Sequence, residues 1–292
     1  SKRYGQRTVV DRLNLRVPQG AVYGFLGPNG SGKSTTMKML LGLLAPTRGQ
    51  ISVLGRPFTP ATRAEVMSRT GSMIENPPGY GHLTGAENMR IAAKMQGLSD
   101  QQISRALALV RLTEHKDRLV RTYSMGMKQR LGIALALARE PELLILDEPT
   151  NGLDPAGIEE VRRLLVELSG EGVTVMVSSH LLDEIDRMAS TLGILSAGRL
   201  VFQGTRAELM STSVPDTLLG CSRPLAAAHL LSARGTASAY EHGLLRVPGL
   251  SQQATADVVT LLVREDIRVH EVRQEEQTLE DVFMALTQGG GL

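Results

Sequence analysis

The stretch Gly27-Pro28-Asn29-Gly30-Ser31-Gly32-Lys33-Ser34-Thr35 matches the pattern G-x-x-x-x-G-K-[ST], which is typical of a loop that binds nucleotide phosphates. An apolar run of strand length, residues 21–26, precedes it, and residues 34–44 carry apolar side chains at helical spacing. This strand-loop-helix context is the one that the pattern requires. Glycine-rich turns also serve as plain connections, but the Lys-Ser-Thr that ends the stretch favours a nucleotide site.

The backbone and two side chains of this loop are expected to act on the nucleotide in different ways. The glycines allow several backbone N–H groups to point at one centre, and the following helix adds the positive end of its dipole. We expect Lys33 to contact the outer phosphates and the Ser34 hydroxyl to ligate Mg²⁺. The residues predicted to bind the nucleotide here are Asn29, Gly30, Ser31, Gly32, Lys33, Ser34 and Thr35.

The composition narrows the classes of protein. The 292 residues are enough for two domains, and a formal net charge of +2 gives no general attraction to nucleic acid or to an anionic membrane. Aromatic residues make up only 3% and Trp is absent, so few side chains can stack on bases, and nucleic-acid binding is not expected. The single cysteine, Cys221, excludes an intrachain disulfide and favours a reducing compartment. No apolar stretch approaches the roughly 18 residues of a membrane-spanning helix.

Strand patterns and helical patterns alternate along residues 1–75 and 141–210. Alternating apolar residues at 13–17 predict a strand beside the one at 21–26. Further strands are predicted at 51–53, 143–146, 173–177, 191–195 and 200–203, and a helix at 155–169. Strands separated by helices in this way predict an α/β fold with a mostly parallel sheet.

Residues 76–140 have a helical pattern throughout. Thr84 with Glu87, and Ser99 with Gln102, have the spacing of capping boxes, and helical periodicity follows each of them. A third helix is predicted over residues 126–139. We therefore expect a helical subdomain inserted into the α/β core.

The last part of the chain has a different order of elements. Residues 211–216 form a polar linker, and residues 217–292 show strand and helix patterns in the order βαββαβ followed by one helix. This order predicts a small α+β domain of the ferredoxin-like kind. It contains no recognisable catalytic group, and its role stays open between regulation, dimer contact and docking to a membrane subunit.

Two acidic residues end the apolar run at 143–146. Asp147 and Glu148 are followed by Pro149, which favours an extended conformation at Glu148. Because successive side chains of a strand point to opposite sides, the two carboxylates should have different roles. We assign Asp147 to Mg²⁺ and Glu148 to orienting and deprotonating the attacking water. A solvated acidic pair at a strand end is common, but the phosphate loop upstream favours the catalytic interpretation.

Together these motifs resemble the ATP-binding subunit of an ABC transporter, over roughly residues 1–210. Tyr123–Arg130, with the sequence Tyr-Ser-Met-Gly-Met-Lys-Gln-Arg, stands where that family has its signature Leu-Ser-Gly-Gly-Gln. Asn151–Asp154 matches the D-loop of the family, and Ser178–His180 its switch histidine. The resemblance implies a P-loop NTPase of the ABC cassette type, with ATP and Mg²⁺ as cofactors.

The resemblance also implies roles for four residues outside the phosphate loop. Ser124 and Gly126 would close over the γ-phosphate held by a second copy of the chain, in a head-to-tail dimer with two ATP molecules. Ser124 suits this role because a serine N-cap leaves free N–H groups that form an anion site. His180 would sense the γ-phosphate, although a lone histidine is often structural, and Tyr4 would stack on adenine, although it can equally pack on the surface.

Two departures from the family pattern narrow the resemblance. Met125 and Met127 replace a glycine and the glutamine of the signature, so only Ser124 and Gly126 are transferred as ligands. Glu75 stands where most members have the glutamine of the Q-loop. A carboxylate near phosphates costs about 4 kcal/mol at ~4 Å in an effective dielectric near 20, so Glu75 must lie near Mg²⁺ or be held away from the phosphates. With a glutamate at this position, the chain resembles the ATPases of the bacitracin and lantibiotic self-protection exporters.

These observations predict an ATPase subunit that dimerises on ATP and drives a separate transmembrane permease to export a peptide antibiotic, a drug or a similar hydrophobic cargo. The resemblance places it in the cytoplasm, peripheral on the inner face of the cell membrane, with the permease contact near residues 76–96. One alternative is a soluble ABC-type ATPase that acts on the ribosome or DNA. Another is an inactive regulatory cassette, which the intact Lys33, Asp147, Glu148 and His180 disfavour.

Overall fold

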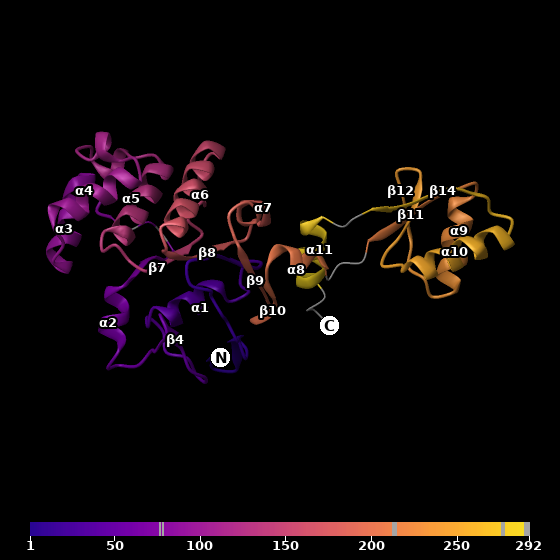
Figure 1. Cartoon of the computed structure of the whole chain (residues 1–292), viewed down its shortest axis with the longest axis horizontal. Helices are drawn as coiled ribbons and strands as arrows, with labels where there is room; N and C mark the ends of the chain where they lie inside the picture. Colours follow the sequence, from indigo (N-terminus) through magenta and orange to yellow (C-terminus); the bar gives the residue numbers. More distant parts are fainter. Residues whose placement is uncertain (76, 78, 212–214, 276–277, 289–292) are drawn as a thin grey trace. The chain divides into compact units, whose positions relative to one another are not determined.

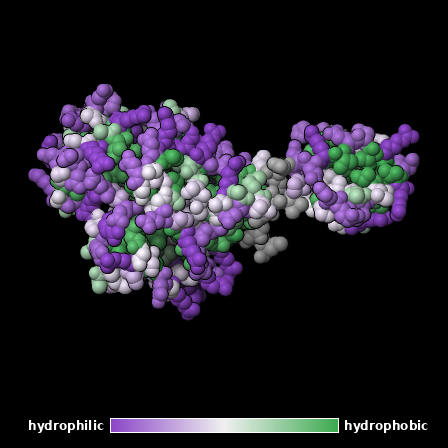
Figure 2. All heavy atoms as spheres, viewed as in Figure 1, coloured by the Kyte–Doolittle hydropathy of each residue, from purple (hydrophilic) through white to green (hydrophobic). Residues whose placement is uncertain are grey.

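The computed structural model describes residues 1–292 except residues 76, 78, 212–214, 276–277 and 289–292. The described residues divide into two compact units, formed mainly by Ser1–Arg206 and by Ala207–Ala285 (Figure 1). Hydrophilic side chains cover most of the face of the first unit that Figure 2 shows. Within the described residues, no helix has both the length and the apolar character needed to cross a membrane.

A six-stranded sheet forms the centre of the first unit. Its strands lie in the order β10-β9-β3-β8-β7-β6, and all neighbours are parallel except β10 and β9. The strands are β3 (Val22–Leu26), β6 (Thr70–Met73), β7 (Leu143–Asp147), β8 (Thr174–Ser179), β9 (Thr191–Ser196) and β10 (Arg199–Gly204). Every residue of β3, β7 and β8 is buried, which explains their continuous apolar sequences. The predicted mostly parallel sheet is confirmed.

Helices connect the strands of this sheet. They are α1 (Lys33–Leu40), α2 (Arg63–Ser68), α6 (Pro155–Gly170) and α7 (Leu182–Asp186), and α8 (Arg206–Ser211) follows the last strand of the sheet. The start of α6 follows from its sequence, because Asp154 accepts a hydrogen bond from the N–H of Gly157 and Pro155 occupies the first turn. Phe25 and Ile145 of the sheet share a buried cluster with Met37 of α1, and this packing fixes the start of α1 against β3 and β7.

Short strands lie outside the main sheet, and one strand prediction is wrong. The pairs are β1 (Lys2–Tyr4) with β2 (Arg7–Val10), and β4 (Ser52–Val53) with β5 (Arg56–Pro57). Residues 13–17, predicted as a strand, have no strand partner in the described part of the chain. Their apolar side chains still pack against the core and line a cavity of about 930 Å³. The alternating apolar residues at 13–17 are therefore explained by burial of their side chains and not by strand pairing.

The helical subdomain contains α3 (Gly85–Gln96), α4 (Asp100–Leu109) and α5 (Met125–Leu137), with short 3-10 turns at Thr113–His115 and Val120–Thr122. Both predicted capping boxes are present, at Thr84 with Glu87 and at Ser99 with Gln102. Helix α5 contacts α3 and α4 as well as β6 and β7. Because it is buried on several sides, it joins the helical subdomain to the sheet.

The second unit contains a four-stranded antiparallel sheet in the order β12-β13-β11-β14. Its elements are β11 (Asp216–Cys221), α9 (Pro224–Ala233), β12 (Ala239–Glu241), β13 (Leu244–Val247), α10 (Gln252–Arg264) and β14 (Val269–Glu275), and α11 (Leu279–Gln288) follows. This is the βαββαβ order and the strand arrangement of a ferredoxin-like domain. Cys221 lies in its core, and burial raises the pKa of the thiol. Of the predicted linker 211–216, residues 212–214 lie outside the described residues.

Candidate active site

The phosphate loop leaves the carboxyl end of β3, and α1 begins at Lys33. Gly27 approaches the neighbouring strand so closely that a Cβ there would overlap the carbonyl oxygen of Leu195. Gly32, at the start of α1, has a φ of 108°, which favours glycine. The Ser31 hydroxyl is buried and has no hydrogen-bond partner among the described residues. An unsatisfied hydroxyl beside the first N–H groups of a helix fits a phosphate oxygen.

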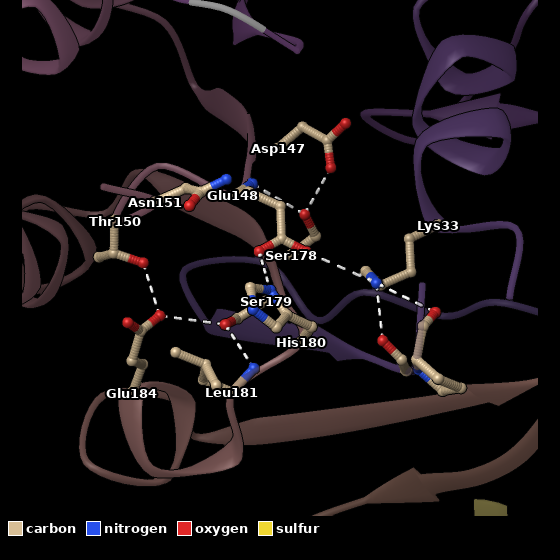
Figure 3. Close-up of polar contacts among 12 residues, drawn as sticks. Lys33, Asp147, Glu148, Thr150, Asn151, Ser178, Ser179, His180, Leu181 and Glu184 are labelled. Carbon is tan, nitrogen blue, oxygen red and sulfur yellow. Dashed lines mark hydrogen bonds and ion pairs between the residues drawn. The ribbon is translucent and has the colours of Figure 1, made fainter. Parts of the chain in front are cut away.

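Lys33 lies across this loop. Its side chain is 5% exposed, and Nζ donates to the carbonyl oxygens of Gly27 at 2.7 Å and Pro28 at 3.4 Å. Nζ also lies 3.5 Å from Oε1 of Glu148, which forms an ion pair between the phosphate loop and the end of β7 (Figure 3). The structure thus brings together two of the predicted catalytic residues.

Asp147 and Ser178 lie side by side because β7 and β8 pair in parallel register at these two residues. The Ser178 hydroxyl donates to Oδ1 of Asp147 at 2.6 Å, and Asp147 is buried. Ser178 Oγ accepts the backbone N–H of Glu148 at 3.0 Å. One serine therefore holds Asp147 and the backbone of Glu148, and the two carboxylates point in different directions (Figure 3).

The backbone of Glu148 is not extended, contrary to the effect expected of Pro149. Its φ is +50°, a left-handed conformation that is uncommon for a residue with a side chain. The hydrogen bond to Ser178 and a second one, from the Asn151 N–H to the Glu148 carbonyl at 3.1 Å, fix the residue in this turn. Tertiary contacts therefore override the preference that proline imposes on the preceding residue.

His180 follows β8 and reaches the other oxygen of the same carboxylate. Its Nδ1 lies 2.6 Å from Oε2 of Glu148. An ionised carboxylate only accepts hydrogen bonds, so this contact assigns a proton to Nδ1. The Glu148 carboxylate consequently lies between the cation of Lys33 and the imidazole of His180, with one oxygen facing each.

The oxygen groups near the phosphate loop fit a magnesium site completed by phosphate. Ser34 is in the first turn of α1, and Asp147 ends strand β7, which contacts α1. Across the described residues, no group of three or more His, Cys, Asp or Glu side chains is placed to hold a metal alone. In nucleotide sites Mg²⁺ is bound through one or two protein oxygens together with phosphates and water, and the Ser34 hydroxyl and the Asp147 carboxylate are oxygen groups of this kind.

Glu75 pairs with a lysine of α1, and its proposed place near Mg²⁺ stays a prediction. It is 63% exposed, has a φ of 67° and accepts a hydrogen bond from Nζ of Lys38 at 2.5 Å. This hydrogen bond raises the pKa of the Lys38 ammonium. Lys38 lies one helical turn beyond Ser34 on α1, a spacing that is visible in the sequence. Sequence reasoning missed Lys38 as the counter-ion of Glu75, with which it forms an ion pair.

Tyr4 lies in β1 and is 50% exposed, with the ammonium of Lys2 5.1 Å from its ring centroid. An exposed aromatic ring of this kind is compatible with stacking on a base. The structure gives no contact that selects between this role and packing on the surface, so the adenine assignment stays a prediction.

Ser124 and Gly126 lie in the helical subdomain, at the start of α5. Ser124 Oγ accepts the N–H of Met127 at 3.2 Å, and the helix begins at Met125. A Cβ at Gly126 would meet Leu153 at 3.5 Å, and one at Gly152 would meet Met125 at 3.3 Å. The signature segment therefore packs against residues 151–153 of its own chain. The structure does not place Ser124 or Gly126 in the cluster of Lys33, Glu148 and His180.

Sequence reasoning also missed Thr150 and Glu184. Their side chains form a hydrogen bond beside Ser179, close to Glu148 and His180 (Figure 3). The only sequence signal is that Glu184 follows His180 by one helical turn.

This fold and this cluster define the ATP-hydrolysing subunit of a transporter, and the chain belongs to the ABC transporter family, whose pattern matches residues 10–151. It is 41% identical over 296 residues to the bacitracin transport ATP-binding protein BcrA of Enterococcus faecalis, with 100% of this chain and 96% of the relative covered. It is 44% identical over 202 residues to the lantibiotic transport ATP-binding protein SrtF of Streptococcus pyogenes, with 69% and 86% covered.

Solved structures agree with the fold. A structure titled as the ATP-binding subunit of an ABC transporter superposes with a TM-score of 0.65 at 32% identity, covering 72% of this chain and 89% of that one. The predicted family and fold are confirmed. The names of the relatives favour transport over an ATPase of the ribosome or DNA.

Proposed function

We propose that this chain hydrolyses Mg²⁺-bound ATP in a head-to-tail dimer and drives a separate transmembrane permease that exports a peptide antibiotic or a similar hydrophobic cargo. The observation that carries the proposal is the Glu148 carboxylate held between Lys33, at 3.5 Å, and His180, at 2.6 Å. A residue that orients the attacking water and a cation that binds the phosphates are recurring parts of enzymes that transfer a phosphoryl group to water. Here the imidazole of His180 holds the first of these groups in place.

Each group has a distinct role in this proposal. Glu148 orients the attacking water and accepts its proton, and His180 fixes the carboxylate through its Nδ1 proton. Lys33 and the N–H groups at the start of α1 bind the phosphates, with the free Ser31 hydroxyl beside them. Ser34 and Asp147 would hold Mg²⁺, which when bound neutralises negative charge on the phosphates.

The dimer is proposed because the signature segment lies on a separate subdomain. Ser124 is exposed at the start of α5, where it can close over a phosphate held by a partner chain. One relative in structure, MJ0796, is titled a dimeric ABC transporter cassette, and at 24% identity it supports the fold alone.

The cargo is proposed from the relatives. BcrA is named for bacitracin transport and SrtF for lantibiotic transport, and Glu75 departs from the usual Q-loop glutamine. We therefore propose export of a peptide antibiotic, with the chain peripheral on the cytoplasmic face of the membrane.

The test is to express the chain in a sensitive host together with any multi-span membrane protein that is found to be encoded next to its gene. Growth in bacitracin, in a lantibiotic and in daunorubicin is compared with a strain that carries Glu148→Gln at the same expression level. We expect protection against one peptide antibiotic that depends on Glu148. An active ATPase that protects against none of them would refute the cargo, and an ATPase stimulated by ribosomes or DNA would refute the transport role.

A further inference from the structure

Glu184, in α7, connects the two segments that carry the proposed catalytic groups. Its Oε2 accepts the hydroxyl proton of Thr150 at 2.5 Å and that of Ser179 at 3.0 Å (Figure 3). Thr150 is two residues after Glu148, and Ser179 is the residue before His180. A single carboxylate oxygen therefore links the end of β7 to the end of β8.

Burial makes this link strong. Thr150 is 4% exposed and Ser179 1% exposed, so both hydroxyls need a partner inside the protein. Hydrogen bonds to an ionised acceptor are roughly twice as strong as those between neutral groups. Ser179 Oγ also accepts the N–H of Leu181 at 2.9 Å, which fixes the turn in which His180 lies.

The hydrogen bonds of Glu184 support the segment that contains the strained backbone of Glu148. Glu148 has a φ of +50°, and such a conformation persists only where the surroundings hold it. Ser178 holds the N–H of Glu148, but Thr150 is the buried side chain that fixes the segment after Pro149. Without Glu184 the Thr150 hydroxyl loses this acceptor, and both Glu148 and His180 lose a shared support.

We propose that Glu184 is a positioning residue for ATP hydrolysis, which acts through Thr150 and Ser179 to keep Glu148 and His180 at their 2.6 Å contact. This inference rests on the proposed function of Glu148. Glu184 contacts neither the phosphate loop nor the carboxylate of Glu148 in these hydrogen bonds, so it is not assigned a catalytic role. Misplacement of a reacting group by about 1 Å can cost on the order of 10²-fold in rate.

The experiment measures kcat for ATP hydrolysis, ATP affinity and the unfolding midpoint in the full chain. The variants are Glu184→Ala and Thr150→Val, which removes the hydroxyl with little change of shape. Asp183→Asn is the matched control, because Asp183 is an exposed acid on the same helix. We expect kcat to fall by roughly 10- to 100-fold in both variants, with ATP affinity close to that of the unaltered chain. The unfolding midpoint should also fall, more in Glu184→Ala, which leaves two buried hydroxyls without this acceptor, but both variants should be fully folded at the assay temperature.

Two further comparisons separate positioning from a purely structural role. The double variant Glu184→Ala, Thr150→Val should lose no more activity than Glu184→Ala alone, because Glu184→Ala already removes the acceptor of the Thr150 hydroxyl. Added to Glu148→Gln, the Glu184→Ala change should lower the residual rate no further.

If Thr150→Val and Glu184→Ala keep the activity of Asp183→Asn, the inference is wrong. If Glu184→Ala does not fold, Thr150→Val alone decides in the same way. If Glu148→Gln itself keeps normal hydrolysis, the proposed function fails first, and that result is visible without any Glu184 variant.

Discussion

His180 Nδ1 and Glu148 Oε2 are 2.6 Å apart although the residues follow two different strands, β8 and β7. The contact exists because these strands are neighbours and pair in parallel register, so their carboxyl ends meet at one edge of the sheet. The proposed base is thus oriented by a group that also lies beside the phosphate loop. Catalysis then depends on the relative positions of three strand ends, those of β3, β7 and β8.

Replacement of the base tests this arrangement most directly. We expect Glu148→Gln to lower kcat by about 10²- to 10⁴-fold, because the amide cannot accept the proton of the attacking water. ATP binding should persist, and an ATP-dependent dimer should become easier to detect by gel filtration. Glu171→Gln, an exposed change directly after α6, serves as the control. If the Glu148→Gln variant releases phosphate at a near-normal rate, the assignment of Glu148 as the base is wrong.

The composite site can be tested by mixing two inactive chains. Lys33→Ala removes the phosphate-binding cation, and Gly126→Asp places a carboxylate in the signature segment, where a Cβ has ordinary contact at 3.5 Å. Each chain alone should be inactive, since a carboxylate repels phosphate. A mixture should recover hydrolysis, because one of the two sites in a mixed dimer combines an intact Lys33 with an intact signature segment. Mixed dimers that form without any recovery would show that the site lies within one chain.

Glu75→Gln should leave ATP affinity unchanged. The side chain is exposed and pairs with Lys38, and exposed ion pairs contribute little to stability. Instead, we expect Glu75→Gln to weaken the stimulation of ATP hydrolysis by the permease, which is measured in membrane vesicles. Lys38→Gln is the companion variant, since it removes the same pair from the other side. Loss of nucleotide binding by Glu75→Gln would place this residue in the binding site and not in coupling.

One capping box should make stability depend on pH. Hydrogen bonds from the backbone N–H and hydroxyl of Thr84 lower the pKa of Glu87. A lowered pKa adds stability above the unfolded value of about 4.3, and this stability is lost as pH falls through the folded value. Urea unfolding of Glu87→Ala should therefore show its largest loss near neutral pH and a smaller loss in acid. Gln102→Ala, in the box that has no titratable side chain, should cost the same at each pH. An equal cost of Glu87→Ala across the series would contradict this prediction.

Features encoded by neighbouring residues were predicted from the sequence. The loop between β3 and α1, the acidic end of β7 and both capping boxes depend on residues only a few positions apart. Residues 13–17 show the limit of this reasoning. Their alternating apolar side chains face the core, but the backbone N–H of Arg16 donates to the side chain of Gln203 in β10 and not to the backbone of a strand.

The candidate site was predictable as a set of residues but not as a geometry. The left-handed Glu148 depends on Ser178, which is distant in sequence, and Pro149 indicated the opposite conformation. The pairs Lys38 with Glu75 and Thr150 with Glu184 depend on which strands become neighbours, which no local pattern specifies. Tertiary structure therefore decides how these side chains are oriented.

Cys221 is the only cysteine of the chain, and its thiol lies in the core of the second unit with a raised pKa. Maleimides react with exposed thiolates, so at neutral pH this thiol should be left unmodified. A single cysteine introduced at an exposed position such as Glu171 would then carry the only fluorophore of each subunit. Energy transfer between two such labels would follow subunit association during ATP turnover in a protein that keeps its native cysteine.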